Sequence, residues 1–239
     1  MLVVEVVSHC YAQELSHYAG LLCYQWSSFL LHKPKNCEVI ATVCTCIEDD
    51  LTNSVVQWFM DKTPLRIRQI MMSKPSIGRR AIGRNQAALS TKADFVWFAD
   101  VDQVYQDGCL DRLVSMKWPA EAVMIFPHTI KIHSDWAIGD QYVKGLAREP
   151  KILDINVSDF QDKTYHRAIG GVQIVCGDFA RAHGYLDKHP KWQAQVEKPF
   201  GSFTDDRQYR GACVKYGSIV SVDLPGMYRL RHSTTSYKS

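Results

Sequence analysis

The chain has 239 residues, of which 46% are hydrophobic and 22% are charged, and its formal net charge is +3 at pH 7. This composition is ordinary for a globular protein, and the length allows one α/β domain or two small ones. The small positive charge permits an anionic ligand without demanding one, and no dense basic tract indicates nucleic-acid binding.

The cysteine pattern favours buried free thiols. Eight cysteines are scattered singly except for Cys44 and Cys46, which fall on one face of a predicted strand. No further Cys or His completes a zinc pattern, so we expect reduced thiols and a cytoplasmic location. The N-terminal stretch lacks the basic region of a signal peptide, and no apolar run approaches the length of a membrane span.

The first part of the chain alternates predicted strands and helices. We expect strands over 2–7, 38–45, 65–72 and 95–99, with helices over 13–31, 51–60 and 78–90 between them. This rhythm predicts right-handed crossovers and a parallel sheet. Arg66 and Arg68 fall on one face of the third strand, which indicates a position near the edge of the sheet.

The second part of the chain is less regular. We expect strands over 122–126, 172–176 and 218–224 and helices over 109–117, 178–184 and 204–215. The segment 129–167 is expected to be irregular apart from a helix over 136–146, segment 187–202 to be a loop, and 226–239 to be a tail. No repeat or linker interrupts the chain, so one domain over 1–239 is the economical interpretation.

Two carboxylates follow the most apolar strand. Asp100 and Asp102 come directly after the run 95–99, and alternation puts both on one side of an extended segment. Two such close charges repel unless a cation bridges them, and hard oxygen ligands suit Mg²⁺ or Mn²⁺. Ligands bind at the carboxyl ends of the strands in open α/β sheets. The alternative is a surface turn that happens to carry two acids.

Other polar side chains point to the same edge of the predicted sheet. Arg79 and Arg84, at the start of a predicted helix, are candidates for an anion site, because a helix N-terminus adds partial positive charge. The surrounding glycines lack the Lys-Ser/Thr ending of a phosphate loop, and two solvated arginines are the alternative. The loops after the first two strands contribute Ser8, His9, Tyr11, Glu48 and Asp49.

Taken in order, these motifs resemble GT-A-type glycosyltransferases, and most closely the inverting family 2 enzymes. The positions that match the family pattern are Arg79, Asn85, Gln86, Ala87, 95–102, 169–172, Arg181, 184–187, Asp205, Asp206, Arg210 and His232. The resemblance implies a single Rossmann-like, three-layer α/β/α domain with a mixed, mostly parallel sheet. Residues 1–102 would form the nucleotide-sugar-binding half, and 103–239 the acceptor-binding half and C-terminal tail.

The resemblance also implies an activity. The chain would be a metal-dependent hexosyl- or pentosyltransferase that moves a sugar from a nucleotide-diphosphate sugar, a UDP-sugar by family habit, to an acceptor hydroxyl with inversion. Mn²⁺ or Mg²⁺ would be held by Asp102, Asp100 and His232, and Asp206, in preference to Asp205, would be the catalytic base. The implied donor-binding residues are Ser8, His9, Tyr11, Asp49, Arg79, Arg84, Asn85, Asp100 and Gly171.

Three departures from the family pattern are visible. His9-Cys10-Tyr11 stands where a Thr or Ser commonly precedes an aromatic residue, and Asp205-Asp206 replaces the usual Glu-Asp. No Q-x-x-R-W signature follows, so a processive polymer synthase is not expected. Helix N-cap duty is the alternative role for the two acids.

Two other functions remain as alternatives. A nucleotidyltransferase of related fold would open with a Gly-rich loop followed by Arg and Lys, which residues 8–13 do not show. A non-catalytic nucleotide-sugar-binding module would not need the acids at 205 and 206 or His232. The acceptor is open: a sugar, a small metabolite, a protein or modified nucleic acid. Trp136, Trp192 and His128 lie where acceptor contacts are expected, whereas His133 and His166 are expected at the surface.

Overall fold

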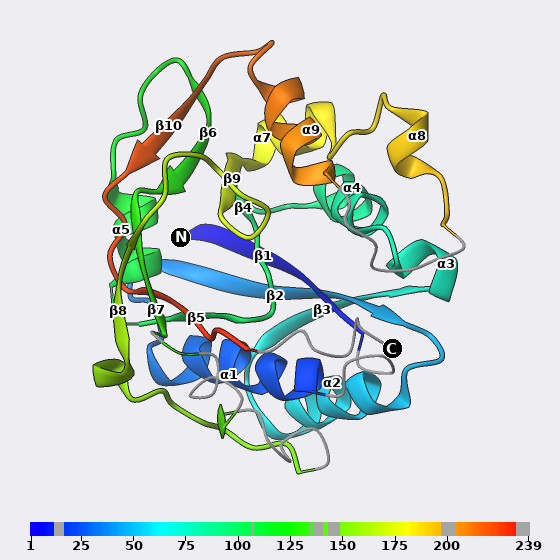
Figure 1. Ribbon diagram of the computed structural model, residues 1–239, viewed down its shortest axis with the longest axis vertical. Coiled ribbons are helices and arrows are strands. Elements are labelled where there is room, and N and C mark those ends of the chain that lie inside the picture. The colour runs from blue at the N-terminus through cyan, green and yellow to red at the C-terminus, as the bar shows by residue number, and fades with distance from the viewer. Residues whose placement is uncertain are drawn as a thin grey trace.

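A seven-stranded sheet runs through the middle of the protein (Figure 1). The computed structural model describes residues 1–11, 17–106, 108–133, 135, 141–142, 149–196 and 204–232. The strands follow the order β10-β6-β9-β4-β1-β2-β3. Their bounds are β1 Leu2–Cys10, β2 Cys37–Cys46, β3 Arg66–Met72, β4 Phe95–Phe98, β6 Ala122–Pro127, β9 Gln173–Cys176 and β10 Ser218–Val222.

The sheet is mixed and mostly parallel, as expected. β1 pairs in parallel with β2 and β4, β2 with β3, and β6 with β10. Among the described strands of this sheet, only β9 runs antiparallel, between β4 and β6. The prediction that Arg66 and Arg68 mark an edge strand is confirmed, because β3 ends the sheet. The central strands are buried on both faces, which is why their sequences are nearly continuous apolar runs.

Helices cover both faces of this sheet. α1 (His17–Leu31) and α2 (Asp50–Lys62) lie on one face, and α4 (Arg80–Ser90) and α7 (Gly177–His183) lie on the other (Figure 1). The helix that was predicted over 78–90 begins at Arg80, and the short helix α3 (Lys74–Ile77) precedes it. Three further helices among the described residues are α5 (Cys109–Ser115), α8 (Pro190–Gln193) and α9 (Asp205–Cys213). None of the described helices is long and apolar enough to cross a membrane.

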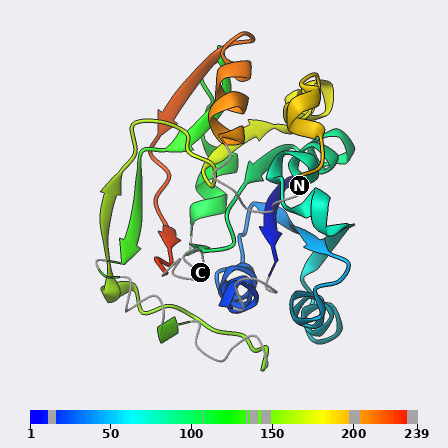
Figure 2. The ribbon, with the colours of Figure 1, turned by 45° about the vertical axis from the view of Figure 1, so that its right-hand side comes forward.

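A second sheet of four strands, in the order β5-β11-β7-β8, stands beside the first (Figure 2). Its strands are β5 Gln103–Tyr105, β7 Thr129–His133, β8 Phe160–Thr164 and β11 Met227–Arg229, with a 3₁₀ turn at Val157–Asp159 before β8. The expectation of irregular chain over 129–167 and a bare tail after 226 was wrong. β8 exposes nearly all its side chains and β11 has three residues, so neither carries a hydrophobic period. Most of the helix expected over 136–146 lies outside the described residues.

The core contains protonated thiols and a carboxylate that is fully hydrogen-bonded. All eight cysteines are free, and burial raises the pKa of Cys44 to about 12, so its thiol stays protonated. Glu5, in the middle of β1, is 1% exposed. It accepts hydrogen bonds from Thr42 Oγ1 at 2.5 Å, from Thr91 Oγ1, and from Arg68 Nη1 at 2.8 Å. Arg68 thus brings a charge from the edge strand to a carboxylate inside the sheet.

Arg68→Met should lower the free energy of unfolding by about 3 kcal/mol or more, because it leaves Glu5 buried without its cation. Urea denaturation followed by circular dichroism measures the change. Arg66→Met is the matched control, since Arg66 and Glu38 are 61% and 49% exposed and such pairs contribute little. Equal losses in the two variants would contradict the assigned role of Arg68.

Candidate functional site

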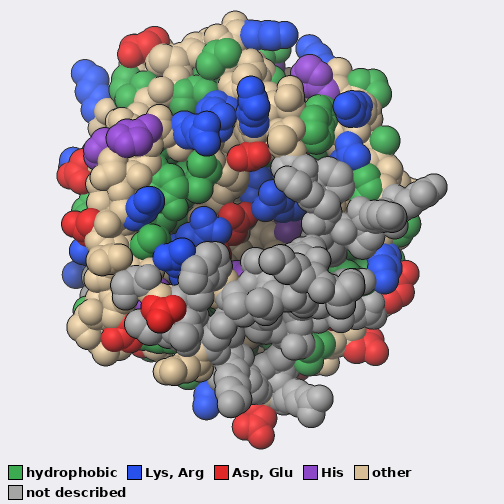
Figure 3. Space-filling model, in the orientation of Figure 1, with side chains coloured by type: hydrophobic (Ala, Val, Ile, Leu, Met, Phe, Trp, Pro, Cys, Tyr) green, Lys and Arg blue, Asp and Glu red, His purple; other side chains and the backbone are tan. Residues whose placement is uncertain are grey.

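The acidic pair lies where the two sheets meet. Asp100 and Asp102 follow β4, and the next residues enter β5 of the smaller sheet. The Leu230 backbone N–H, just after β11, donates to the Asp102 carbonyl at 2.7 Å. β4 and β11 therefore bring the two carboxylates and the end of the described chain together. Figure 3 shows acidic side chains among Lys and Arg side chains in a hollow on this face.

Arginines from two elements surround the pair. Asp100 Oδ1 accepts from Arg80 Nη1 at 3.3 Å and from Arg84 Nη2 at 3.4 Å. Arg229 Nε donates to Asp102 Oδ2 at 2.7 Å, and its Nη2 lies 3.8 Å from Asp100 Oδ2. The expectation that both carboxylates face one side agrees with this geometry, because one guanidinium contacts both.

The two carboxylates differ in acidity. Burial alone would raise the pKa of Asp100, but Arg80, Arg229 and Arg84 outweigh it and hold that pKa below the usual value. Burial raises the pKa of Asp102, and the Asp100 charge adds to the rise, although Arg229 and His232 oppose it. Asp100 is therefore the more strongly ionised member of the pair, and Asp102 is the one whose charged form gains most from another cation.

His232 lies beside the pair, as expected. Its Nε2 is 3.9 Å from Asp102 Oδ2, and its ring meets Tyr18 edge-on with centroids 5.4 Å apart. The side chain is 9% exposed. An imidazole and two carboxylates from separate segments thus converge on one place.

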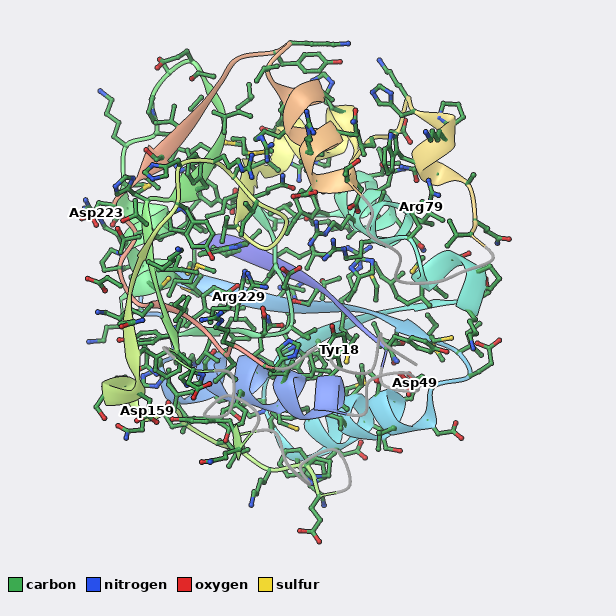
Figure 4. The ribbon with its side chains drawn as sticks, viewed as in Figure 1. Tyr18, Asp49, Arg79, Asp159, Asp223 and Arg229 are labelled. Atoms are coloured by element: carbon green, nitrogen blue, oxygen red, sulfur yellow. The ribbon has the colours of Figure 1, made fainter. Side chains whose placement is uncertain are left out.

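The arginines at the start of α4 have different surroundings. Arg84 is fully buried and donates to Tyr185 Oη at 3.1 Å and to the Ala99 carbonyl at 3.3 Å, so it supports Asp100 from beneath. Arg79 turns to α8, where it donates to the Lys191 carbonyl and lies 5.5 Å from the centre of the Trp192 ring. Figure 4 places Arg79 and Arg229 in separate parts of the molecule.

Sequence reasoning missed Arg80 and Arg229. Arg80 is the neighbour of Arg79, and the turn of the helix decides which of the two faces Asp100. Arg229 stands three residues before His232, in a segment from which only the histidine was expected to reach the site. β11 has only three residues, so no periodic pattern in this segment indicated the contact of Arg229 with the acidic pair.

β1 extends to Cys10, so Ser8 and His9 belong to the strand and not to the loop after it, and Ser8 supports Asp100 through Gln25 of α1. Ser8 Oγ donates to Gln25 Oε1 at 2.8 Å, and Gln25 Nε2 donates to the Asp100 carbonyl at 2.9 Å. His9 is buried, and neither ring nitrogen has a hydrogen-bond partner among the described residues. Burial, aided by the charges of Arg84 and Arg80, holds the pKa of His9 well below its usual value, so the ring is neutral. Tyr11 is 1% exposed and has the Lys74 ammonium 5.9 Å from its ring centre.

Asp49 and Asn85, two further candidate donor-binding residues, are also held by hydrogen bonds within the protein. Asp49 is fully buried as the N-cap of α2, where it accepts from Thr52 N at 3.3 Å and Thr52 Oγ1 at 2.6 Å. Asn85 accepts from Tyr185 N at 2.8 Å and donates to Asp187 at 2.9 Å. Both side chains are thereby fixed as parts of the scaffold around the site.

The paired glycines allow a close approach to the acids. A Cβ at Gly171 would lie 2.7 Å from Asp100 Oδ2 and 2.2 Å from Gln103 Nε2. The Gly171 carbonyl is fixed by Trp97 Nε1 at 3.2 Å and by Gln103 Nε2 at 2.5 Å. A Cβ at Gly170 would touch Asp206 Cβ at 3.4 Å. The glycines thus separate Asp100 from α9 by little more than backbone.

The two acids of α9 have different exposure. Asp205 is fully buried, its oxygens have no hydrogen-bond partner among the described residues, and Arg80 Nη2 lies 3.7 Å from its Oδ1. Asp206 is partly exposed and lies against Gly170. Arg80 therefore links Asp205 to Asp100, whereas Asp206 is partly exposed.

The aromatic and histidine candidates for acceptor binding are dispersed. Trp192 packs under Arg79, and Trp136 lies outside the described residues. His128 and His166 are exposed with ring centroids 6.4 Å apart. The expectation that His133 is a surface residue was wrong, because it is fully buried and stacks on Phe160 at 3.9 Å.

The site can be tested for its fit to a divalent cation. Within the described part of the chain, no three His, Cys, Asp or Glu side chains form a ready-made metal cluster. Asp102 Oδ1 is nevertheless buried without a hydrogen-bond partner, and Asp100 and His232 lie near it. Carboxylates with an imidazole suit Mg²⁺ or Mn²⁺. The residues fit such an ion once the hydrogen bond between Arg229 and Asp102 is broken.

Comparison with solved structures gives the fold a context. TarS of S. aureus superposes with a TM-score of 0.59 at 13% identity, over 99% of this chain and 62% of that one. The mannosyltransferase PcManGT from Pyrobaculum calidifontis, in complex with GDP-Man and Mn²⁺, gives 0.58 at 14% identity, over 95% and 56%. TarS in complex with UDP-GlcNAc gives 0.57 at 14% identity, over 100% and 61%.

These comparisons confirm the expected GT-A fold. The chain spans about six-tenths of the length of the structures it matches. No protein-family model matches the sequence, and a search of curated protein sequences finds no match. The likeness is therefore one of fold, and the activity has to be argued from the site.

Gly171→Ala should destabilise the protein by about 1–3 kcal/mol, because the new methyl group overlaps Gln103 and Asp100. Gly211→Ala in α9 is the control: nothing lies within 4 Å of its Cβ position, so the better helix former should stabilise by about 0.5–1 kcal/mol. Thermal and urea unfolding measure both. A neutral Gly171→Ala would show that the glycine is not required by the approach of Asp100.

Proposed function

We propose that the protein is a metal-dependent, inverting glycosyltransferase that moves a sugar from a nucleoside-diphosphate sugar to an acceptor hydroxyl. The observation that carries the proposal is the acidic pair at the end of β4, ringed by Arg80, Arg84 and Arg229. Complexes of similar folds with UDP-GlcNAc and with GDP-Man and Mn²⁺ support a nucleotide-sugar donor. The likeness to family 2 remains part of the proposal.

The acidic pair and the arginines would hold the donor's diphosphate. Asp102, with Asp100 and His232, would hold Mn²⁺ or Mg²⁺. The bound ion would neutralise charge on the leaving diphosphate. Arg80 and Arg229 contact the pair directly, so we assign them to the diphosphate oxygens in place of Arg79. Arg84 is enclosed, and its role is to fix Asp100.

The nucleoside would lie over the ends of β1 and β2. Ser8 and Gln25 connect the end of β1 to the Asp100 carbonyl. The neutral ring of His9 has two nitrogens without a hydrogen-bond partner among the described residues. Such a ring can donate one hydrogen bond and accept another. We propose UDP as the nucleotide, with His9 and Tyr11 nearest the base.

Asp206 is the proposed base. It is partly exposed, whereas Asp205 is buried against Arg80 and is better suited to holding that arginine. Asp206 takes the proton of the acceptor hydroxyl, the hydroxyl oxygen bonds to the anomeric carbon, and the bond from that carbon to the diphosphate oxygen breaks. The diphosphate leaves with the electron pair. Attack from the face opposite the leaving group gives inversion.

A thermal-shift screen of nucleotide-sugars with and without Mn²⁺ tests the proposal, since a ligand that binds the folded state raises Tm. A cation-dependent shift with one nucleotide class, followed by sugar transfer or donor hydrolysis, is the expected result. Nucleotide binding without transfer or hydrolysis would instead favour a binding module. No shift with any nucleotide would contradict the proposal.

Asp206→Asn should keep donor affinity and lower the transfer rate by about 10²–10⁴-fold, because a general base typically contributes that much. Isothermal titration gives the affinity, and product formation gives the rate. Full turnover in this variant would move the base to Asp205 or elsewhere.

Asp102→Ala should abolish the cation-dependent part of nucleoside-diphosphate binding, since it removes the carboxylate with the unpaired oxygen. Titration with UDP in the presence and absence of Mn²⁺ measures this part. Asp111→Ala is the control, because Asp111 caps the backbone of residues 35 and 36 instead. Undiminished affinity of Asp102→Ala for UDP with Mn²⁺ would show that Asp102 does not hold the cation.

A further inference from the structure

The Arg229 guanidinium occupies the carboxylates of Asp100 and Asp102, where a divalent cation would bind. Arg229 ends β11, whose register pairs it with Gln103 of β5 and with Ile132 of β7, so its backbone is fixed by both neighbours. Its Nε bonds to Asp102 Oδ2 at 2.7 Å, and its Nη2 is 3.8 Å from Asp100 Oδ2. A cation that bound both carboxylates would have to displace this guanidinium.

The charges of the cluster are already balanced. Asp100, Asp102 and Asp205 face the guanidinium groups of Arg80, Arg84 and Arg229. A divalent cation added to this cluster alone would leave one guanidinium without its carboxylate in a poorly solvated place. A cation that arrives with a diphosphate brings the anion that such a guanidinium needs.

The three arginines are not equally free to change partners. Arg84 is fully buried and is held by Tyr185 and the Ala99 carbonyl. Arg80 is shared between Asp100 and Asp205. The side chain of Arg229 is 30% exposed, and within the described residues its hydrogen bonds and ion pairs go only to the acidic pair. Arg229 is therefore the arginine that can leave.

We propose that Arg229 is the resident counter-cation of Asp100 and Asp102, and that it moves from Asp102 to the donor's diphosphate when the donor binds together with a divalent cation. The inference rests on the proposed function and adds an order of binding. The free protein has weak affinity for the cation alone, and Arg229 makes cation binding depend on the donor.

Mn²⁺ binding without nucleotide tests the proposal, with the free ion followed by electron paramagnetic resonance. Arg229→Met should bind Mn²⁺ about tenfold or more tightly than the natural chain, because the competing charge is gone. Arg231→Met removes the same charge two residues away and should leave the affinity unchanged. Asp102→Asn in the Arg229→Met background should abolish the gain. An equal gain in Arg231→Met, or no gain in Arg229→Met, would overturn the proposal.

A second readout covers the stability of the variant. Arg229→Met leaves Asp102 buried without its partner, so its Tm should fall, and Mn²⁺ alone should raise that Tm more than it raises the Tm of the natural chain. If Arg229→Met does not fold, Arg229→Lys replaces it: lysine lacks the two-sided guanidinium contact, and a gain of severalfold is expected. An unchanged affinity in that variant would overturn the proposal.

One further titration distinguishes a wrong role for Arg229 from a wrong proposed function. The natural chain is also titrated with UDP and Mn²⁺ together. If UDP binds but Mn²⁺ alone binds the natural chain as tightly as it binds Arg229→Met, the counter-cation role is wrong and the donor site stands. If UDP does not bind at all, the proposed function fails.

Discussion

The balance of charge at the end of β4 is the constraint on which the site depends. Asp100 and Asp102 are one residue apart and largely withdrawn from water, where like charges repel strongly and unpaired charges are costly. Arginines offset both costs. The same arrangement gives the site its chemistry, because carboxylates and guanidinium groups held together are ready to exchange partners with a cation and a diphosphate.

This balance requires both sheets. The large sheet delivers the carboxylates and, through α4, Arg80 and Arg84, whereas the small sheet delivers Arg229. The chain passes from β4 into β5 within a few residues, and β5 pairs with β11. A site at this junction receives groups from segments far apart in the sequence, and the small sheet contributes Arg229 to it.

The sequence was informative where the signal was local. Unbroken apolar runs predicted the parallel strands, and two arginines predicted the edge at β3, both correctly. β8 and β11 were missed because a strand with polar, exposed side chains or only three residues has no period to detect. The same limit applies to the site. Asp100, Asp102 and His232 were predicted from motifs, whereas the contact of Arg229 with the pair arises from the pairing of β11 with β5, which no short pattern encodes.

A crystal structure with UDP and Mn²⁺ tests the central claim most directly. The account predicts Mn²⁺ at Asp102, the diphosphate between Arg80 and Arg229, and the Arg229 guanidinium no longer bonded to Asp102. Nucleotide bound elsewhere on the protein, or bound here with the bond between Arg229 and Asp102 intact, would contradict it.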